Sequence, residues 1–336
     1  MTISVTGSSG YIGGSLAEEL ESHESVSKVR RIDRSPTSSI DERTIILDLA
    51  RVSVGKLAEV LKGTDYLFHL AAARTDWGLS YAEYHHDNAV ATKNLIDAAQ
   101  QAGVTQWIYF GTVGVYGPSE EPKNEKAQFA PTTDYGQTKA EAERSLFRAA
   151  RSYGWNVGVI RPSAVFSEGQ PDNTNIFRLI EANRKRRFVL IGEGAQIKTT
   201  SYLQNTVDAA IWLFNRVMEA VTPEIQAFNY VDEPKLTTNQ MVRIIRDELG
   251  IARPPLKVPR TMVEKPALFF DAIARVTGRD LPITSARIRK FSTATDFDAS
   301  AIRKAGFAPR YSSIDALIRT TRSHLKLPTL ATHDNT

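Results

Sequence analysis

Two side chains suited to proton transfer stand four residues apart in the stretch DYGQTKAEAE, which spans residues 134–143. They are the phenol of Tyr135 and the ammonium of Lys139, in a stretch with the composition of a helix. Residues four apart on a helix share one face, one above the other. A free tyrosine titrates near ~10, too high for a general base at neutral pH, but a neighbouring ammonium favours the phenolate. The pair is therefore a candidate for acid and base chemistry, although an isolated pair of this kind is more often a surface feature.

A glycine-rich loop near the N-terminus has the spacing of a dinucleotide site. The segment TGSSGYIGG follows an apolar strand pattern and opens a helical one. Its glycines permit a tight turn and let the backbone approach a pyrophosphate, which the free N–H groups and positive end of the helix then face. The residues expected at the phosphates are Gly7, Ser9, Gly10, Tyr11, Ile12 and Gly13.

The acid Asp33 ends the second predicted strand, 20 residues beyond Gly13, and bears on the choice of nucleotide. A carboxylate there accepts hydrogen bonds from the ribose diol of adenosine and repels a 2′-phosphate. NAD is therefore favoured over NADP. Arginines at 30, 31 and 34 flank the acid, and Arg34 could meet a phosphate, so NADP stays open as the less favoured cofactor.

The elements that must position these residues alternate along the first half of the chain. Apolar runs predict strands at 3–7, 29–33, 44–48, 65–72, 107–112 and 156–162. Amphipathic stretches predict helices at 11–22, 54–62 and 88–103. Apolar strands that alternate with helices indicate a parallel sheet covered on both faces. The predicted fold class is α/β, a doubly wound parallel sheet of Rossmann type with a smaller C-terminal α/β lobe for the substrate.

The pattern changes after Pro162. Helices are predicted at 175–188, 206–220 and 237–250, strands at 188–192 and 226–232, a proline-rich connection at 251–259, and a last helical hairpin. Residues 1–165 are expected to form the dinucleotide domain, with segments near 195–230 returning to it, residues 166–330 mainly the substrate lobe, and residues 331–336 a disordered tail. The amphipathic segment 266–278 is interpreted as a cap on that lobe, with contact to a membrane surface as the alternative.

The composition excludes several classes of protein. There is no cysteine, so disulfides, thiolate metal sites and thiol catalysis are excluded. The six histidines show no ligand spacing, and no metal is expected. The net charge is only +4, without an aromatic-interleaved basic stripe, so nucleic acid is not expected. The run NRKRR at 183–187 is interpreted as the basic end of a helix, with contact to a diphosphate as the alternative. The N-terminus shows no export signal and no apolar run could span a bilayer, so we expect a cytoplasmic protein without a transmembrane segment.

A hydroxyl at the end of the fifth predicted strand, Thr112 in FGTVGVYG, would lie at the carboxyl end of the sheet, where ligands bind. With it the chain resembles the extended short-chain dehydrogenase/reductase family, in the NAD-dependent epimerase/dehydratase branch that acts on nucleotide sugars. The matching segments are TGSSGYIGG, Asp33, LDL at 47–49, HLAA at 69–72, the helix at 88–99, TVGVYG at 112–117, YGQTK at 135–139 and IRP at 160–162. The resemblance implies Thr112, Tyr135 and Lys139 as the catalytic residues.

The same resemblance implies further contacts. Beyond the glycine loop, the residues it assigns to the cofactor are Asp33, Arg34, Asp48, Leu49, Leu70, Ala71, Ala72, Asn88, Tyr135, Lys139 and Pro162. The candidates for the substrate are Arg74, Thr112, Val113, Asn175, Lys198 and Arg289. Ala164, Phe166 and Thr200 stand where the family often has an asparagine, a tyrosine and an arginine, so its contacts to a sugar diphosphate do not carry over. A homodimer is usual for the family.

Departures from the family's patterns reduce the number of reactions that this chain could catalyse. The dehydratases that eliminate water carry an acid pair after the catalytic threonine, where this chain has Val113 and Gly114, and the enzymes that make fucose-type sugars use a cysteine, which is absent. Hydride transfer at a sugar carbinol remains, with Tyr135 taking the hydroxyl proton and Thr112 orienting the oxygen.

The fate of the keto sugar separates the remaining functions. If it is reduced on its other face, the result is 4-epimerisation of a nucleotide sugar, or of a lipid-linked sugar, in cell-surface polysaccharide biosynthesis. If it leaves, the protein is a dehydrogenase or ketoreductase of sugars, and a sterol-type hydroxy dehydrogenase would share every residue named. A non-catalytic NAD-binding sensor is disfavoured because it has no need of a poised phenolate.

Overall fold

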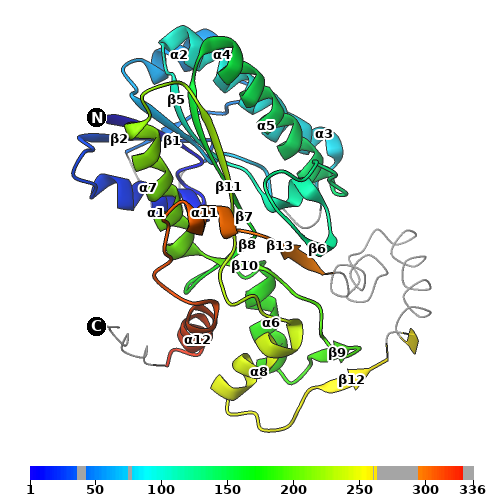
Figure 1. The fold of residues 1–336 in the computed structure, drawn as a ribbon. Coiled ribbons are helices and arrows are strands. Elements are labelled where there is room, and N and C mark those ends of the chain that lie inside the picture. Colours follow the sequence, from blue (N-terminus) through cyan, green and yellow to red (C-terminus); the bar gives the residue numbers. More distant parts are fainter. Residues whose placement is uncertain (36–42, 75–77, 260, 263–293, 328–336) are drawn as a thin grey trace.

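The computed structural model describes residues 1–35, 43–74, 78–259, 261–262 and 294–327 (Figure 1). Its centre is a seven-stranded parallel sheet with the order β11-β7-β5-β4-β1-β2-β3. The chain builds outward from β1 to β3, then returns beside β1 and builds the other half, so the direction of winding reverses between β1 and β4. These strands are β1 (Thr2–Thr6), β2 (Lys28–Asp33), β3 (Thr44–Ile46), β4 (Tyr66–His69), β5 (Gln106–Phe110), β7 (Asn156–Pro162) and β11 (Ile225–Tyr230).

Helices cover both faces of this sheet, as the apolar strands require. One face packs against α1 (Tyr11–Glu21) and α7 (Leu203–Glu219), and the other against α2 (Val54–Leu61), α4 (Ala91–Ala102) and α5 (Asp134–Tyr153). In β5 the side chains alternate: Trp107 and Tyr109 enter the core beneath α2, α4 and α5, whereas Ile108 enters the core beneath α1 and α7. The α/β class and the doubly wound parallel sheet are confirmed.

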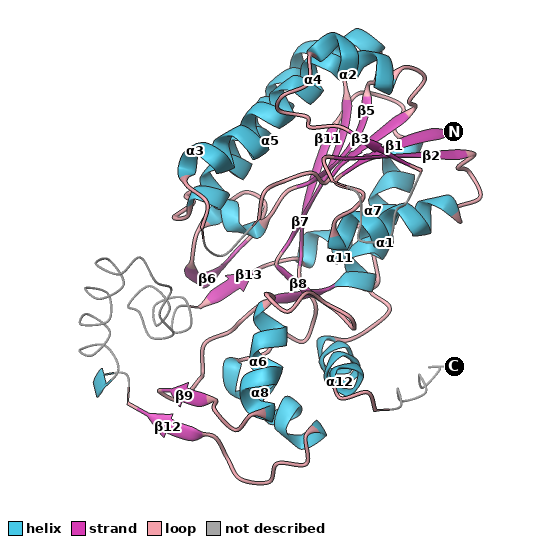
Figure 2. Cartoon of the chain, turned by 180° about the vertical axis from the view of Figure 1, so that it is seen from behind, coloured by secondary structure: helices cyan, strands magenta, loops and turns pink. Residues whose placement is uncertain are grey.

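A smaller lobe follows the sheet, at the lower end in Figure 2. Its strand pairs are β8 (Ala164–Phe166) with β10 (Thr200–Tyr202) and β9 (Val189–Ile191) with β12 (Leu256–Val258), and β6 (Ser119–Lys123) with β13 (Thr295–Phe297) lies between lobe and sheet. Its helices are α6 (Asn175–Arg184), α8 (Thr238–Glu248) and α12 (Ser313–His324), whereas α11 (Ser300–Lys304) packs against the sheet beside β11. A separate core of buried side chains, including Phe166, Ile180, Met241, Ile245 and Leu317, joins α6, α8 and α12.

The sequence pattern at 75–87, between the fourth predicted strand and its helix, favours a loop over the sugar, but the segment 78–87 is partly helical. It contains α3 (Tyr81–Tyr84), which begins with a capping box between Ser80 and Glu83, and it runs on into the π-helix η1 (His85–Val90). The helix predicted at 88–103 therefore begins inside a π turn. Period-3.6 reasoning does not detect a π turn, because its apolar positions differ from those of an α-helix by a single residue.

Two corrections concern the lobe. The proline-rich connection predicted at 251–259 contains β12, which pairs with β9. The helix predicted at 175–188 ends at Arg184, and Arg186 has a left-handed backbone with φ of 54°. By contrast, the capping box that opens the helix at 237–250 is present between Thr237 and Gln240. The segments 266–278 and 331–336 lie outside the described residues. In the described part of the chain, no helix is long and apolar enough to cross a membrane.

Candidate active site

A cavity of about 310 Å³ opens where β1, β2 and β4 end, beside the point where the winding reverses. In open parallel sheets this is where ligands bind. Its walls come from five segments of the sheet domain. The lining residues are Gly7, Ser9, Gly10, Ile32, Asp33, Arg34, Ser35, Leu47, Asp48, Leu49, Ala50, Leu70, Ala71, Ala72, Ala73, Asp87 and Ala91. Most residues predicted for the cofactor thus meet in one hollow.

The glycine loop at one end of this cavity tolerates no side chain at two positions. Gly7 has φ of 75°, and a Cβ there would lie 2.6 Å from the amide nitrogen of Ala71. A Cβ on Gly13 would lie 2.0 Å from the carbonyl oxygen of Gly7. The helix α1 that follows starts at Gly10 without a side-chain cap, so its first N–H groups are left for a ligand.

Polar groups in the same loop fit a dinucleotide. The hydroxyl of Ser9 is buried and has no hydrogen-bond partner among the described residues, as expected of a group that meets a phosphate. The carboxylate of Asp33 accepts hydrogen bonds from the backbone N–H of Ser9, at 2.9 Å, and of Ser35, at 3.3 Å. Asp48 accepts the N–H of Ala50 at 3.0 Å. The loop, the cavity and the acids together therefore suit an adenine dinucleotide with an unphosphorylated ribose.

Arg34 is held by an acid that the sequence reasoning did not identify. Its Nη1 lies 2.5 Å from a carboxylate oxygen of Asp87, which η1 brings to the cavity wall. An arginine engaged by a carboxylate is less available for a 2′-phosphate, which further favours NAD. The sequence did not predict this role of Asp87, because the residue stands in the stretch expected to be a loop over the sugar.

Thr112 and Tyr135 come together beyond the end of β5. Thr112 caps the short 3-10 helix Val113–Tyr116, and its hydroxyl accepts the N–H of Gly114 at 3.1 Å. The side chain of Thr112 lies near the Tyr135 phenol and interacts with it. Burial raises the pKa of the Tyr135 phenol, while the charge of Arg74 and the interaction with Thr112 oppose that rise. Tyr84 packs edge-on against the ring of Tyr135, with 6.2 Å between centroids.

Lys139 lies one turn further along α5 and is almost wholly buried, with 3% of its surface exposed. Its ammonium donates to the carbonyl of Phe110 at 2.7 Å and lies over the ring of Tyr109, 4.2 Å from the centroid. Burial lowers its pKa to about 7, and the carboxylate of Glu143 opposes that fall. In this structure Lys139 is thus directed at the end of β5, and Arg74 is the cation that acts most strongly on Tyr135.

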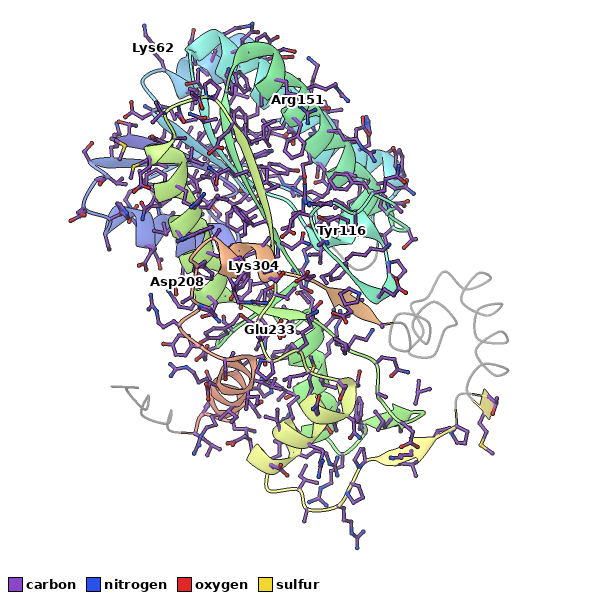
Figure 3. The ribbon with its side chains drawn as sticks, in the orientation of Figure 1. Lys62, Tyr116, Arg151, Asp208, Glu233 and Lys304 are labelled. Atoms are coloured by element: carbon purple, nitrogen blue, oxygen red, sulfur yellow. The ribbon has the colours of Figure 1, made fainter. Side chains whose placement is uncertain are left out.

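A buried ion pair supports this face of α5. Glu143, one turn beyond Lys139, is fully buried and accepts from Nε of Arg161 at 3.0 Å and also from its Nη2. Arg161 in turn donates to the hydroxyl of Tyr116 at 2.5 Å, and that hydroxyl donates to Asn229 at 3.0 Å. The labelled Tyr116 lies at the junction of sheet and lobe (Figure 3). The spacing of Tyr135, Lys139 and Glu143 at four-residue intervals was a signal for this pair, because all three occupy one helix face.

Asn88 braces the loop after β4. Its side chain accepts the N–H of Ala73 at 2.7 Å and donates to Thr138 of α5 at 3.0 Å, so it ties the cavity wall to the helix that carries Tyr135. Pro162 ends β7 and pairs with Tyr230 of β11. These contacts of Asn88 and Pro162 form without a ligand, and they fix the position of the backbone around the site.

The predicted substrate residues are spread over a wider area. Arg74 is exposed, and its charge acts on both Tyr11 and Tyr135. Val113 is buried behind Thr112, Asn175 is the first residue of α6, and Lys198 forms a bridge to Thr295. Arg289 lies outside the described residues. Tyr11 joins the two halves of the protein, because its hydroxyl lies 2.5 Å from that of Ser167 in the loop after β8.

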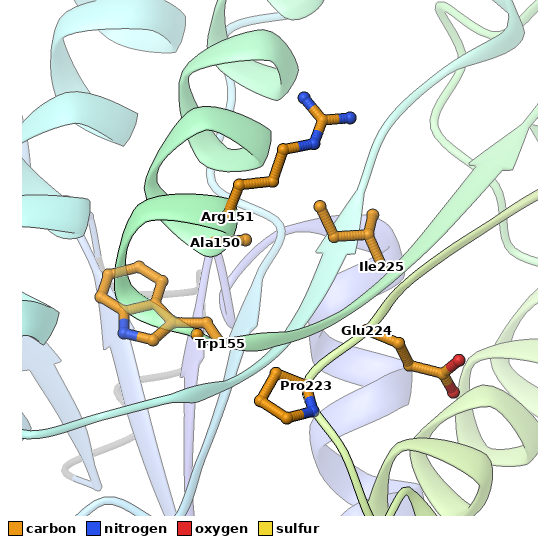
Figure 4. A pocket seen from close by; sticks show the side chains of 7 residues that line it. Ala150, Arg151, Trp155, Pro223, Glu224 and Ile225 are labelled. Atoms are coloured by element: carbon orange, nitrogen blue, oxygen red, sulfur yellow. The ribbon is translucent and has the colours of Figure 1, made fainter.

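A second hollow of about 320 Å³ lies at the opposite edge of the sheet, where β7 and β11 begin (Figure 4). Arg151, Trp155, Pro223 and Glu224 line it. It lacks a glycine cradle and lies away from the carboxyl ends of the strands, so it is not the reaction site.

No group of histidines and acids suited to a metal ion occurs among the residues that the structure describes. His69 is buried between the hydroxyls of Thr6 and Thr92, at 2.7 and 2.9 Å, and burial lowers its pKa to about 3.

Comparison with known proteins adds four findings. Residues 3–229 match the model of the NAD dependent epimerase/dehydratase family. An Escherichia coli protein, N-acetyl-alpha-D-glucosaminyl-diphospho-ditrans,octacis-undecaprenol 4-epimerase, is 27% identical over 94% of this chain and 92% of its own length. The 3-beta-hydroxysteroid dehydrogenase of Mycolicibacterium neoaurum is 27% identical over 78% of this chain and 74% of its own. The solved structure of MoeE5 in complex with UDP-glucuronic acid and NAD shares the fold, with a TM-score of 0.75 at 24% identity over 97% of this chain and 99% of that one.

Proposed function

Because the chain belongs to the NAD dependent epimerase/dehydratase family, we propose that it is an NAD-dependent 4-epimerase of diphosphate-linked sugars. The observation that carries the proposal is the pairing of Thr112 and Tyr135, which lies beyond the end of β5 with Lys139 buried behind it. The substrate hydroxyl would meet this pair, while the dinucleotide would occupy the cavity along the ends of β1, β2 and β4.

The glycine loop and Asp33 would hold NAD by its pyrophosphate and adenosine ribose, with Asp48, Leu49 and Leu70 to Ala72 along the rest of the cavity. Bound NAD+ supplies the acceptor for the hydride of the sugar carbon, returns that hydride, and adds a positive charge that favours the Tyr135 phenolate. The loop must stay free of side chains for this, as the close contacts at Gly7 and Gly13 require.

Tyr135 is proposed as the base that takes the proton of the sugar hydroxyl as the carbonyl forms, and as the acid that gives it back when the other epimer is made. Burial raises the pKa of this phenol, so the positive charges around it decide whether it ionises at neutral pH. Arg74 is one of these charges, and Lys139 is proposed as another. Thr112 donates to the reacting oxygen and fixes its position.

The proposed substrate is a hexose or N-acetylhexosamine on a diphosphate, carried by a nucleoside or by a polyprenol. Support for a polyprenol carrier comes from the Escherichia coli relative, which matches nearly the whole chain and whose name specifies an undecaprenol-linked substrate. Water elimination is not proposed, because the buried Val113 and Gly114 follow Thr112 in place of acids. The similarity to a steroid dehydrogenase supports a second candidate function. In this function the same three residues would oxidise an alcohol, and the ketone would be released.

An assay with two kinds of substrate tests this proposal. UDP-N-acetylglucosamine, UDP-glucose and undecaprenyl-diphospho-N-acetylglucosamine would each be incubated with the purified protein, with NMR of the sugar and absorbance at 340 nm followed together. A 4-epimer without net NADH is the expected result. Tyr135→Phe should lose about 10²- to 10⁴-fold in turnover, whereas Tyr153→Phe, at the exposed far end of α5, should not. A released ketone with stoichiometric NADH would show that the protein is a dehydrogenase and not an epimerase.

Two further features are proposed. The family resemblance supports a homodimer, and the sugar chemistry supports a place in cell-surface polysaccharide biosynthesis. No nucleic-acid or metal partner is proposed. The size of the particle in sedimentation velocity, with and without NAD, would test the dimer.

A further inference from the structure

One face of the β9–β12 strand pair is apolar and faces solvent. The two strands run parallel, with Leu256 opposite Val189 and Val258 opposite Ile191. Side chains alternate along a strand, so these four residues share one side of the pair. We call Val189, Ile191, Leu256 and Val258 the apolar face. The residue between the first two, Leu190, points to the other side and is 2% exposed.

The exposure of this face is high for aliphatic side chains. Leu256 is 67% exposed and Val189 41%, while Ile191 and Val258 are partly exposed. Met262, four residues after Val258, is 68% exposed. Single exposed apolar residues are ordinary, but a directly paired cross-strand set forms a contiguous patch, which marks an interaction site.

Cations gather at one end of the apolar face. Arg186 and Arg187 immediately precede β9, and Arg253 precedes β12 by a few residues. Because parallel strands begin at the same edge, these three arginines lie toward one end of the pair. All three are exposed, and none forms an ion pair within the described ranges. The preceding cations are already engaged, since Arg184 and Lys185 both pair with Glu181.

The turn between α6 and β9 is built to present these arginines. Arg186 has φ of 54°, and its N–H donates to the carbonyl of Asn183 at 2.9 Å. The N–H groups of Arg187 and Phe188 both donate to the carbonyl of Ala182, at 2.8 and 3.1 Å. These bonds end the helix and hold the backbone while the guanidinium groups remain in solvent. Glu193, two residues after β9, is itself paired with Lys257 at 2.5 Å.

From this arrangement we propose that the β9–β12 end of the substrate lobe docks on an anionic membrane surface. The four aliphatic side chains and Met262 would enter the boundary between headgroups and acyl chains, and Arg186, Arg187 and Arg253 would meet lipid phosphates. The patch consists of two three-residue strands, less than a stable protein interface of roughly 1,000 Å² needs, whereas shallow insertion combined with cations suffices for a membrane. Its charge also complements an anionic surface rather than a second copy of this basic patch.

The position of the patch leaves the proposed active site free. β9 and β12 lie at the far end of the lobe from the sheet and its nucleotide cavity (Figures 1 and 2). Docking at this end would hold the lobe against the plane in which the diphosphate of a lipid-linked sugar lies. The inference goes beyond the proposed epimerase reaction and does not depend on it, since a membrane contact can exist whatever reaction the site performs.

Vesicle flotation with the full-length protein tests the proposal. Vesicles of phosphatidylcholine alone would be compared with vesicles in which phosphatidylglycerol replaces a third of the lipid, at low and high salt. The protein should float with the anionic vesicles and be released by salt. The double variant Val189→Ser/Leu256→Ser should lose at least about tenfold in partitioning, whereas Val221→Ser, which alters a side chain 97% exposed on the sheet domain, should not.

A second pair of variants tests the contribution of the arginines separately from that of the apolar face. Arg186→Gln/Arg187→Gln should lose about fivefold for each cation removed, while Lys56→Gln/Lys62→Gln on α2, at the opposite end of the molecule (Figure 3), should keep full binding. Failure of the wild type to float, or equal flotation of all four variants, would overturn the proposal. A change of oligomeric state in the Ser variant without a change in flotation would assign the face to a second copy instead. Epimerisation of a UDP-sugar, followed in the same samples, reports the proposed reaction separately, and these variants should leave it unchanged.

Discussion

Replacing Lys139 with methionine should stabilise the nucleotide-free protein at and below neutral pH. The methionine fills a similar volume but carries no charge. Lys139 is 3% exposed, and burial lowers its pKa from 10.5 to about 7. The unfolded chain keeps the ordinary pKa, so between these two values the unfolded state binds more protons than the native state. Native stability therefore rises with pH through this window and is lowest below about pH 7.

The size of the effect follows from the same values. At about 1.36 kcal/mol for each pKa unit, a fall from 10.5 to about 7 corresponds to at most about 5 kcal/mol. The carbonyl of Phe110 and the ring of Tyr109 both favour the ammonium, so the gain should be smaller, about 2–4 kcal/mol. In the proposed mechanism a cation is needed beside the reacting groups, so this cost would be a trade of stability for activity.

Urea unfolding of the wild type and Lys139→Met at several pH values between 6 and 10 measures this difference. The stability advantage of the variant should be largest up to about pH 7 and should shrink toward zero as the pH approaches 10. Lys56→Met, at an exposed position on α2, serves as the control and should show no such dependence. A difference that stays constant over the whole range would refute the reasoning, because it would show that Lys139 is not a buried, destabilised ammonium.

Three further predictions concern the loop, the nucleotide acid and the buried ion pair. Gly13→Ala should abolish NAD binding in calorimetry, because its Cβ would lie 2.0 Å from a backbone oxygen, whereas Gly14→Ala, with 3.6 Å to its nearest neighbour, should bind normally. Asp33→Asn should weaken NAD binding by about tenfold and leave NADP binding less affected, and an equal loss for both would contradict the assignment of Asp33 to the ribose. Glu143→Ala and Arg161→Met should each lower the free energy of unfolding by about 3–5 kcal/mol, and additive losses in the double variant would contradict the pairing.

Much of the sheet domain was predictable because its strands are buried on both faces. A run such as NVGVIRP is apolar almost throughout, and every residue of β7 is buried in the structure. The glycine loop was predictable for a related reason, since contacts of 2.0 and 2.6 Å leave no room for any other residue at Gly13 and Gly7. In both places the local sequence and the tertiary environment impose the same requirement.

The parts that were missed depend on tertiary contacts. The π turn that brings Asp87 to Arg34 inserts one residue into a helical pattern, and no local rule separates such a turn from an ordinary helix or loop. The strand β12 follows two prolines and exists because β9 lies beside it. The direction of Lys139 toward Phe110 could not be read from its spacing to Tyr135, because spacing sets the helix face but not the side-chain rotamer.

The most direct test of the account follows a deuterium atom at C4 of the sugar. UDP-N-acetylglucosamine or its undecaprenyl-diphospho counterpart, labelled at that carbon, would be incubated with the enzyme in ordinary water and the product analysed by NMR. Transient oxidation within one site predicts the 4-epimer with deuterium retained at C4 and no accumulated NADH. Loss of the label to water, or a free keto sugar with reduced cofactor, would contradict epimerisation through Tyr135 and a retained NAD.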